Sequence, residues 1–467
     1  MMWFVPALNQ IALSVVDLRV TDRWFREGLG LLPAGGNRAM MRGLLPSLVQ
    51  GLPRAASTCW WLVGRNPWFQ IEMFQFERPL ARLLPHDFRS CDIGYTRIGF
   101  WVADFDAALR RLRRLGSKPM TDPIGERGRR RACVRNPDGV YVEIMEDDPL
   151  PMAAPKRSQC PTSIRTVTLS VPDLDASANF FRDVIGLEES KTSLHTPEHE
   201  ALWELAGATS RHRLFESRDA LVEIVQYVDP VGRPWPDDYR ISDQGILNIA
   251  FGAHSKSDFN EVYERARDAG ARRNCRPIHL PGAGVVYVND AQGFSVELLW
   301  LKPGKGDLRW GFEPRPAGKR PAPDTHSVKR TVRINAPIDN VWAVVSDHER
   351  MADWSGLAPV TLIEDGAPER NGYGAVRRTK GRTGAIVEQI TDWKPLHGLR
   401  YRVIKGSPFD CHQGKIRLKD LGAETELTWT IRFRPKLRGS GPVLRMMVGR
   451  LLRDALDRRL KPLIERA

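Results

Sequence analysis

Apolar and polar residues alternate over residues 167–171, in the sequence VTLSV, as they do in a half-buried strand. Asp173 then stands where a helix N-cap is expected. The apolar residues that follow are spaced four apart, as on one face of a helix: Ala176, Phe180 and Val184. Gly186 is placed to end that helix. The segment therefore predicts a strand, a capped amphipathic helix and a stop.

The same order of elements occurs three more times, in segments that begin at Ile11, Ile98 and Ile249. The residues predicted to cap the four helices are Asp17, Asp104, Asp173 and Asp258. The first and third aspartates are nearly as far apart as the second and fourth, so the repeat is a module doubled and then doubled again. Each module also ends in a strand with one glutamate; these are Glu72, Glu143, Glu223 and Glu297.

This fourfold order resembles the vicinal oxygen chelate superfamily, which includes glyoxalases, ring-cleaving extradiol dioxygenases and bleomycin-resistance proteins. Its unit is a βαβββ module, and two modules enclose one cup-shaped site. The resemblance covers residues 5–150 and 162–302. It implies two domains, 1–150 and 162–302, each with two consecutive modules around one cup. The extradiol dioxygenases also have four modules in two pairs.

The spacing of apolar residues changes after residue 328. A strand, a helix opened by Pro337, several strand-like runs and an amphipathic helix from near Pro442 follow. This order, with the sequences APIDNVW and TELTW, resembles the START-like polyketide cyclase/dehydrase superfamily. Those proteins wrap an antiparallel sheet around a long C-terminal helix and hold a hydrophobic ligand between them. We therefore expect an α+β fold, with a helix-grip domain at 328–467 after the two paired-module domains.

Proline-rich stretches predict flexible linkers at residues 150–162 and from Lys302 to residue 327. The six cysteines show no metal-ligand spacing, and no signal peptide or long apolar run appears, so we expect a cytoplasmic protein without a membrane span. The net charge of +14 suggests an anionic partner or a solvated surface. We favour the surface and expect no nucleic acid partner, because no nucleic-acid-binding module accompanies the charge. The oligomeric state is left open.

In metal-dependent members of the superfamily, the ligands lie on the first and last strands of both modules. In the first pair these positions hold Gln10, Glu72, Arg97 and Glu143. A guanidinium has no lone pair, so we expect Arg97 to neutralise Glu72 and Glu143 instead of binding a metal. The first pair is then a metal-free pocket with buried ion pairs. Its role is either structural or acid/base catalysis with Arg97 binding an anionic group.

In the second pair the corresponding positions hold Thr166, Glu223, Asn248 and Glu297. Extradiol dioxygenases hold iron there through two histidines and a glutamate, and only Glu297 remains. We therefore do not expect an ordinary iron-dependent dioxygenase. An all-oxygen set suits Ca²⁺ or Mg²⁺ better than iron or zinc. Two carboxylates and two neutral ligands would bind such an ion weakly, so we expect no metal, with a divalent ion at Glu223 and Glu297 as the alternative.

Three further features lie inside the repeats. Residues 35–57 are expected to form a lengthened loop over a cup mouth. Trp60 and Trp61 should face opposite sides of a strand, so one of them can line a cup. His195 and His199 are four apart, as metal ligands on a helix can be. Pro197 between them favours a loop, and we expect two surface histidines.

In the C-terminal domain the residues that can face a ligand pocket are Asp353, Trp354, Arg377, Glu388, Trp393, Tyr401, Trp429 and Phe433. Strand alternation supports Trp429 and Phe433 on one face. Arg377 and Glu388 are the polar pair of most interest, and an exposed salt bridge is the alternative for them. Most of the set is expected to form core or cavity wall.

The sequence thus predicts a metal-independent isomerase, cyclase or lyase that acts on a hydrophobic, ring-containing metabolite, such as a polyketide-like, terpenoid or polycyclic compound. The 14 tryptophans supply flat apolar walls. The candidate acid/base residues are Glu72, Glu143, Glu223 and Glu297. The candidate substrate-binding residues are Gln10, Arg97, Thr166, Asn248, Trp354, Arg377, Glu388 and Trp429. One alternative is a non-catalytic protein that sequesters such a compound. Another is a metal-dependent dioxygenase or glyoxalase-type enzyme with unusual oxygen ligands.

Overall fold

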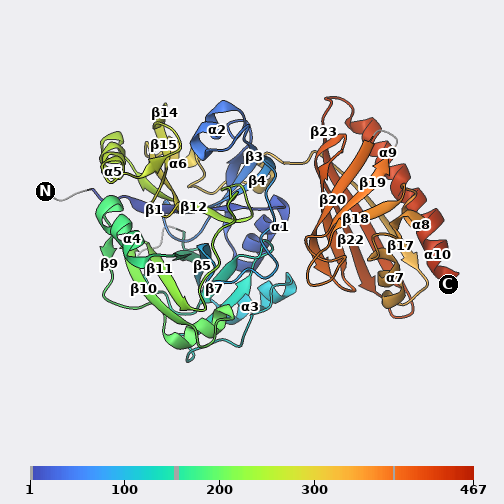
Figure 1. Cartoon of the computed structure of the whole chain (residues 1–467), viewed down its shortest axis with the longest axis horizontal. Coiled ribbons are helices and arrows are strands. Elements are labelled where there is room, and N and C mark those ends of the chain that lie inside the picture. Colours follow the sequence, from blue (N-terminus) through green and yellow to red (C-terminus); the bar gives the residue numbers. More distant parts are fainter. Residues whose placement is uncertain (1–3, 152–156, 382–383, 467) are drawn as a thin grey trace. The chain divides into compact units, whose positions relative to one another are not determined.

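The computed structural model describes residues 4–151, 157–381 and 384–466. It divides into two compact units, Met1–Pro321 and Ala322–Ala467. The four modules lie in the first unit (Figure 1). Residues 152–156 of the first predicted linker lie outside the described residues, and the division into domains 1–150 and 162–302 stays a prediction. Within the described part of the chain, no helix is long and apolar enough to cross a membrane.

The first two modules follow the predicted order of elements. Module one contains β1 Ala7–Ser14, α1 Leu18–Arg23, η1 Trp24–Leu29, β2 Leu32–Asn37, α2 Leu44–Gln50, β3 Ala56–Val63 and β4 Gln70–Arg78. Module two contains β5 Gly94–Val102, α3 Phe105–Arg114, β6 Arg131–Arg135 and β7 Tyr141–Met145. The helix α2 is an addition that module two lacks, and it lies in the predicted long loop.

The last two modules keep the same order with short insertions. Module three contains β8 Thr162–Ser170, α4 Leu174–Asn179, η2 Phe180–Ile185, β9 Glu188–Glu189, η3 Pro197–Trp203, β10 Thr209–Ser217 and β11 Ala220–Asp229. Module four contains β12 Gly245–Ala253, α5 Lys256–Asp268, β13 Arg272–Arg273, β14 Ile278–Leu280, β15 Ala283–Asn289 and β16 Ser295–Leu301. Two short helices follow, α6 Lys305–Arg309 and η4 Ala317–Lys319.

Side-chain caps start the helices of all four modules. The carboxylates of Asp17, Asp104 and Asp173 accept backbone N–H groups at 3.1, 2.8 and 3.0 Å, as predicted. The prediction of Asp258 as the fourth cap is wrong. Ser255 caps that helix, and Asp258 donates its backbone N–H to the Ser255 hydroxyl at 3.1 Å. A serine hydroxyl satisfies the free N–H of the first turn as a carboxylate does, so the helix starts at Lys256.

Strand pairing decides which modules share a cup. Within each module the first strand pairs in parallel with the last: β1 with β4, β5 with β7, β8 with β11 and β12 with β16. Between modules, β1 pairs antiparallel with β12, and β5 pairs antiparallel with β8. Modules one and four therefore form one pair, and we name their shared site the first cup. Modules two and three form the other pair, and we name their shared site the second cup. The expectation that modules one and two share one cup and modules three and four the other is wrong, because β1 pairs with β12 and β5 with β8.

The segment after module four was predicted to be a flexible linker as far as residue 327, but part of it packs against the first unit. Phe312 is fully buried. The Arg320 guanidinium pairs with Asp22 at 2.8 Å and lies 4.0 Å from the centre of the Trp60 ring. A buried ion pair and a cation–π contact hold this stretch in place up to the end of the first unit.

The second unit is a seven-stranded sheet in the order β17-β23-β22-β21-β20-β19-β18, in which every pairing is antiparallel. Its strands are β17 His326–Ile334, β18 Val360–Glu364, β19 Val376–Gly381, β20 Gly384–Lys394, β21 Gly398–Lys405, β22 Phe409–Asp420 and β23 Thr425–Pro435. Its helices are α7 Ile338–Val345, α8 Met351–Ser355, α9 Gly441–Arg453, η5 Asp454–Leu460 and α10 Lys461–Glu465.

The C-terminal helical stretch buries the apolar stripe that its spacing predicted. Leu452, Leu456 and Leu460 are fully buried in one core with strand residues such as Trp429 and Phe433. Figure 1 shows α9 and α10 lying along the sheet of this unit. The predicted α+β fold, with paired-module sheets followed by a helix-grip domain, is confirmed.

Candidate functional site

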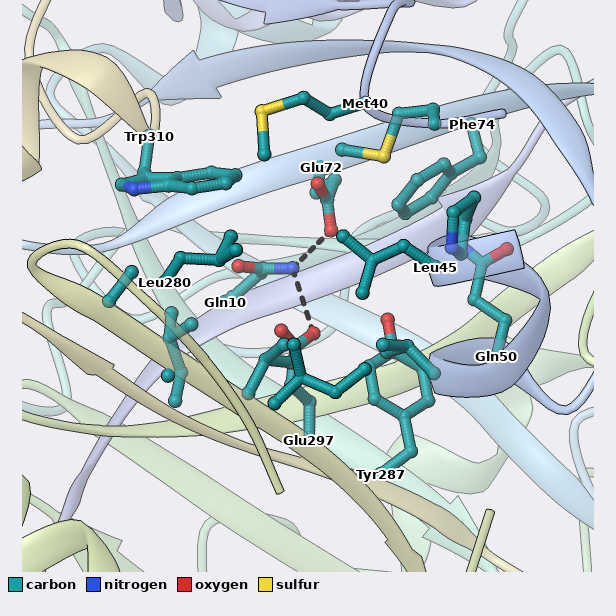
Figure 2. Close-up of a pocket in the computed structure, with 18 of the residues that line it drawn as sticks. Gln10, Met40, Leu45, Gln50, Glu72, Phe74, Leu280, Tyr287, Glu297 and Trp310 are labelled. Carbon is teal, nitrogen blue, oxygen red and sulfur yellow. Dashed lines mark hydrogen bonds between the residues drawn. The ribbon is translucent and has the colours of Figure 1, made fainter. Parts of the chain in front are cut away.

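A cavity of about 110 Å³ lies in the first cup (Figure 2). The strands β1, β3 and β4 of module one line it, with β14, β15 and β16 of module four. Its apolar cover comes from the predicted long loop and α2: Met40, Met41, Leu45, Pro46 and Val49. Trp310 and Phe312, from the segment after module four, complete the wall. The prediction that residues 35–57 cover a cup is confirmed.

Two carboxylates and an amide meet in this cavity. Gln10 of β1 lies between Glu72 of β4 and Glu297 of β16 (Figure 2). Its Nε2 donates to Glu72 Oε2 and, at 3.4 Å, to Glu297 Oε2. Its Oε1 accepts the Gln70 amide at 3.0 Å. Asn248 of β12, fully buried, lies on the strand next to Glu297.

The other oxygen of Glu72 accepts two hydrogen bonds from β3. Trp61 Nε1 donates to Glu72 Oε1 at 2.8 Å, and the Cys59 thiol donates to the same oxygen at 3.1 Å. Trp60 faces the opposite way, and its Nε1 donates to the carbonyl of Pro321 at 2.6 Å. The prediction that one tryptophan of this pair lines a cup is confirmed for Trp61, because side chains alternate along a strand.

Burial shifts both carboxyl groups of the first cup toward the protonated form. Burial raises the pKa of Glu72 to about 7, although hydrogen bonds from Trp61 and Cys59 oppose the shift. Burial and the nearby charge of Glu72 raise the pKa of Glu297 above its ordinary value. Two acids that share one dry site do not both ionise easily, so the pair retains a proton near neutral pH. Burial also raises the pKa of Cys59 and Tyr287, which therefore stay protonated.

The family resemblance implies a divalent metal, and the first cup does not fit one as it is arranged. Gln10 turns its amide nitrogen, which has no lone pair to give, toward both carboxylates. The second oxygen of Glu72 is taken by Trp61 and Cys59. Across the described residues, no group of three or more His, Cys, Asp or Glu side chains is placed to hold a metal ion. No chemical step is therefore assigned to a metal.

The second cup holds Arg97, Glu143 and Glu223, joined by a residue that the sequence did not place there. His195 Nδ1 lies 2.6 Å from Glu223 Oε1, and its Nε2 lies 3.0 Å from Glu143 Oε2. The prediction of a surface histidine is wrong for His195, which is buried, while His199 is half-buried. The loop before η3 thus places His195 between the two buried carboxylates, as a third cationic partner beside Arg97 and Arg131.

Arg97 does not neutralise Glu72 and Glu143 as predicted. Its Nη2 donates to Glu223 Oε2 at 3.0 Å and its Nη1 to the Tyr227 hydroxyl at 3.0 Å, while its guanidinium lies 3.7 Å from the centre of the Trp203 ring. The pairing of modules two and three moves Glu72 to the other cup. The Thr168 hydroxyl, and not that of the predicted Thr166, donates to Glu223, at 2.9 Å.

Charge in the second cup is balanced. Burial lowers the pKa of His195, but Glu143 and Glu223 outweigh burial and raise it to about 9. Burial raises the pKa of the two glutamates, but the charge and hydrogen bonds of His195 outweigh it, so both values lie below the ordinary one. At neutral pH the second cup therefore contains an imidazolium between two carboxylates.

The second unit has its own buried polar cluster. Arg377 Nε donates to Glu388 Oε2 at 2.8 Å, and Arg377 Nη1 donates to His348 Nδ1 at 3.0 Å. Both partners of the ion pair are buried, so an exposed salt bridge is ruled out. Burial and the charge of Arg377 lower the pKa of His348 to about 3, which keeps this ring neutral. An imidazole in that form can accept from Arg377 while Nε2 donates to the carbonyl of Asn371, at 2.9 Å.

The aromatic residues predicted for the same domain pack beside this cluster. Trp429 Nε1 donates to the Tyr401 hydroxyl at 3.1 Å, and the Trp354 ring lies 5.6 Å from that of Trp429. Trp354, Trp429 and Phe433 are almost fully buried. The structure therefore places all three in the core of the helix-grip domain, with Trp429 and Phe433 on the one face of β23 that strand alternation predicted.

Tyr287 and Trp310 are among the residues of the first cavity that sequence reasoning missed. Tyr287 stands opposite Glu297 in the β15–β16 ladder, and cross-strand pairing with Glu297 could have located it. Trp310 lies beyond the last module, in a stretch assigned to a linker, and only its aromatic character set it apart.

Two family models match the chain. The model "Glyoxalase/Bleomycin resistance protein/Dioxygenase superfamily" matches residues 163–298. The model "Polyketide cyclase / dehydrase and lipid transport" matches residues 325–465. A search of curated proteins found no match.

Solved structures similar to each part are known. Glyoxalase I from Zea mays is 17% identical over 66% of this chain and 96% of its own, with a TM-score of 0.46. A START superfamily protein from Mycobacterium smegmatis is 19% identical over 30% of this chain and 99% of its own, with a TM-score of 0.27. The Zhui aromatase/cyclase from Streptomyces sp. R1128 is 24% identical over 30% of this chain and 94% of its own, with a TM-score of 0.27.

The module repeat, the strand pairing and the two family models agree. The chain thus joins a region similar to the glyoxalase, bleomycin-resistance and dioxygenase superfamily, at residues 163–298, to a region similar to the polyketide cyclases and dehydrases, at residues 325–465.

Proposed function

We propose that the first cup is a metal-independent acid/base site that isomerises, cyclises or eliminates from a hydrophobic, ring-containing compound. The observation that carries this proposal is the pair of buried carboxylates, Glu72 and Glu297, that face an apolar cavity and share the amide of Gln10. The two family models support the broader role of ligand binding or cyclase/dehydrase chemistry.

The two carboxyl groups have different roles in this proposal. Glu72 is the base, because Gln10, Trp61 and Cys59 all donate hydrogen bonds that stabilise its anion. Glu297 is the acid, because the charge of Glu72 keeps the pKa of Glu297 raised. A base with a pKa near 7 is half ionised at neutral pH and still accepts a proton readily. Glu72 then removes a proton from a carbon or hydroxyl of the substrate while Glu297 returns one elsewhere.

The cavity walls suit a flat apolar ligand. Trp61, Phe74, Tyr287 and Trp310 supply aromatic surface around the carboxylates. The methionine and leucine side chains from residues 40–49 make the cover of the cavity apolar, and an apolar surrounding strengthens the electrostatic contacts inside. In the second cup, His195 and Arg97 form ion pairs with Glu143 and Glu223. The proposal therefore gives Glu143 and Glu223, which were predicted to be catalytic, a structural role.

The test follows binding and turnover of a panel of ring metabolites, with and without EDTA. Turnover that survives EDTA and falls by roughly 10²–10⁴-fold in Glu72→Gln is the expected result. Glu216→Gln is the matched control, because Glu216 is an exposed glutamate on a strand of the same unit. Turnover that EDTA abolishes would overturn the metal-free mechanism in favour of an enzyme with unusual oxygen ligands. Tight binding without turnover of any compound would replace it with a carrier function.

A further inference from the structure

The two cups present the same pair of carboxylates. In each module the glutamate of the last strand pairs with the residue of the first strand that lies five places before the helix N-cap. These opposite residues are Ala12 for Glu72, Gly99 for Glu143, Thr168 for Glu223 and Ala250 for Glu297. Glu72 and Glu297 in the first cup therefore correspond to Glu143 and Glu223 in the second.

In the second cup the chain itself shows what this pair accepts. His195 places one ring nitrogen 2.6 Å from Glu223 and the other 3.0 Å from Glu143. The Trp203 ring meets the His195 ring at 85°, with 4.9 Å between the centroids. The occupant is thus a flat cation with two N–H groups, held between two carboxylates and against an aromatic wall.

The first cup has the same carboxylates and aromatic walls but no such cation. The amide of Gln10, which carries no charge, joins Glu72 and Glu297. Among the described residues that line the cavity there is no lysine, arginine or histidine. None of these described lining side chains gives the two acids a counter-charge, and Trp61 and Trp310 line the same cavity. Arg309 lies 5.6 Å from the centre of the Trp310 ring, which shows that this ring accepts a cation.

We propose that the first cup selects ring compounds that carry a protonated nitrogen, and that this nitrogen lies between Glu72 and Glu297. The inference rests on the proposed function, since it takes the first cup as the ligand site. A ligand cation donates its N–H groups to both carboxylates and so takes the place of the proton that the pair otherwise holds. The proton that Glu297 returns in the proposed reaction then comes from this N–H. An anionic ligand would meet two carboxyl groups and, among the described residues that line the cavity, no cationic side chain, so the cup rejects it.

The test compares three probes with one ring system: 2-naphthylmethylamine, 2-naphthylmethanol and 2-naphthoic acid. Isothermal titration calorimetry of the full chain at pH 7 measures each affinity. We expect the amine to bind at least about tenfold tighter than the alcohol, because a charge-assisted contact is about twice as strong as a neutral one. The acid is expected to bind weakest.

Two further measurements locate the effect. Glu297→Gln should reduce the preference for the amine over the alcohol, and Glu216→Gln should leave it unchanged. Amine binding to the unaltered chain should release protons, seen as a dependence of the heat on the buffer, and alcohol binding should not. This second readout needs no variant. Cys59 and Tyr287, the other titratable groups beside the pair, stay protonated and contribute no release.

The outcomes separate this inference from the proposed function. An alcohol or acid that binds as tightly as the amine, with affinity that still depends on Glu72 and Glu297, would overturn the choice of a cationic ligand alone. Failure of all three probes to bind, or binding that neither glutamate affects, would overturn both the inference and the assignment of the first cup as the ligand site.

Discussion

Replacing His195 with glutamine should destabilise the first unit in a way that depends on pH. His195 lies between Glu143 and Glu223, at 3.0 and 2.6 Å, and all three side chains are buried. Glutamine is close to histidine in size and can donate a hydrogen bond, but it carries no charge. The substitution therefore removes the cation and leaves two carboxylates that only Arg97 and, more distantly, Arg131 still balance.

The magnitude follows from the pKa of His195. A rise from 6.5 to about 9 in the folded chain corresponds to about 3 kcal/mol of stabilisation. Because the folded value is the higher one, the stabilisation is complete below about pH 6.5 and is lost as the pH rises through about 9. We expect His195→Gln to lower the free energy of unfolding by about 3 kcal/mol at pH 6 and by much less at pH 9.5.

Urea denaturation of the full chain at both pH values, followed by tryptophan fluorescence, measures this difference. Trp203 reports on the cup directly, because its ring touches both His195 and Arg97. His212→Gln is the control, since His212 is exposed and contacts a serine hydroxyl, not a carboxylate. A loss of the same size at pH 6 and pH 9.5 would refute the bridging imidazolium and leave only a packing role.

Three other predictions follow from the same geometry. Glu72→Gln should stabilise the first unit by up to about 3 kcal/mol above pH 7 and little below pH 4.5. The reason is that a carboxyl group whose folded pKa is raised to about 7 lowers the free energy of unfolding as the pH rises from 4.5 to 7. Thermal unfolding at pH 4.5 and pH 8 measures this difference. Arg377→Met should destabilise the second unit by about 3–5 kcal/mol in urea denaturation, because it leaves Glu388 buried without its partner. The control Arg378→Met, at an exposed position, should change the free energy of unfolding little. Limited proteolysis should release the second unit by a cut near the junction of Pro321 and Ala322, and a first cut inside a βαβββ module would contradict the boundary.

Local rules were enough to predict much of this protein. A strand period of two and a helix period near four located the modules, and the short side chain of aspartate marked three of the four helix starts. The same alternation placed Trp61 toward the cavity and Trp60 away from it. Glu72 and Glu297 were found as the acidic positions of last strands, because their place within a module depends only on nearby residues.

The partners of those residues depended on contacts between distant parts of the chain. Each first strand has an edge that can pair with any other first strand, and the sequence patterns of the four are too alike to choose among them. Only the folded chain pairs β1 with β12, which brings Glu72 to Glu297 and takes it away from Arg97. His195 was placed in the same way, because its loop has no period of its own and only the tertiary structure brings together the two carboxylates that it contacts.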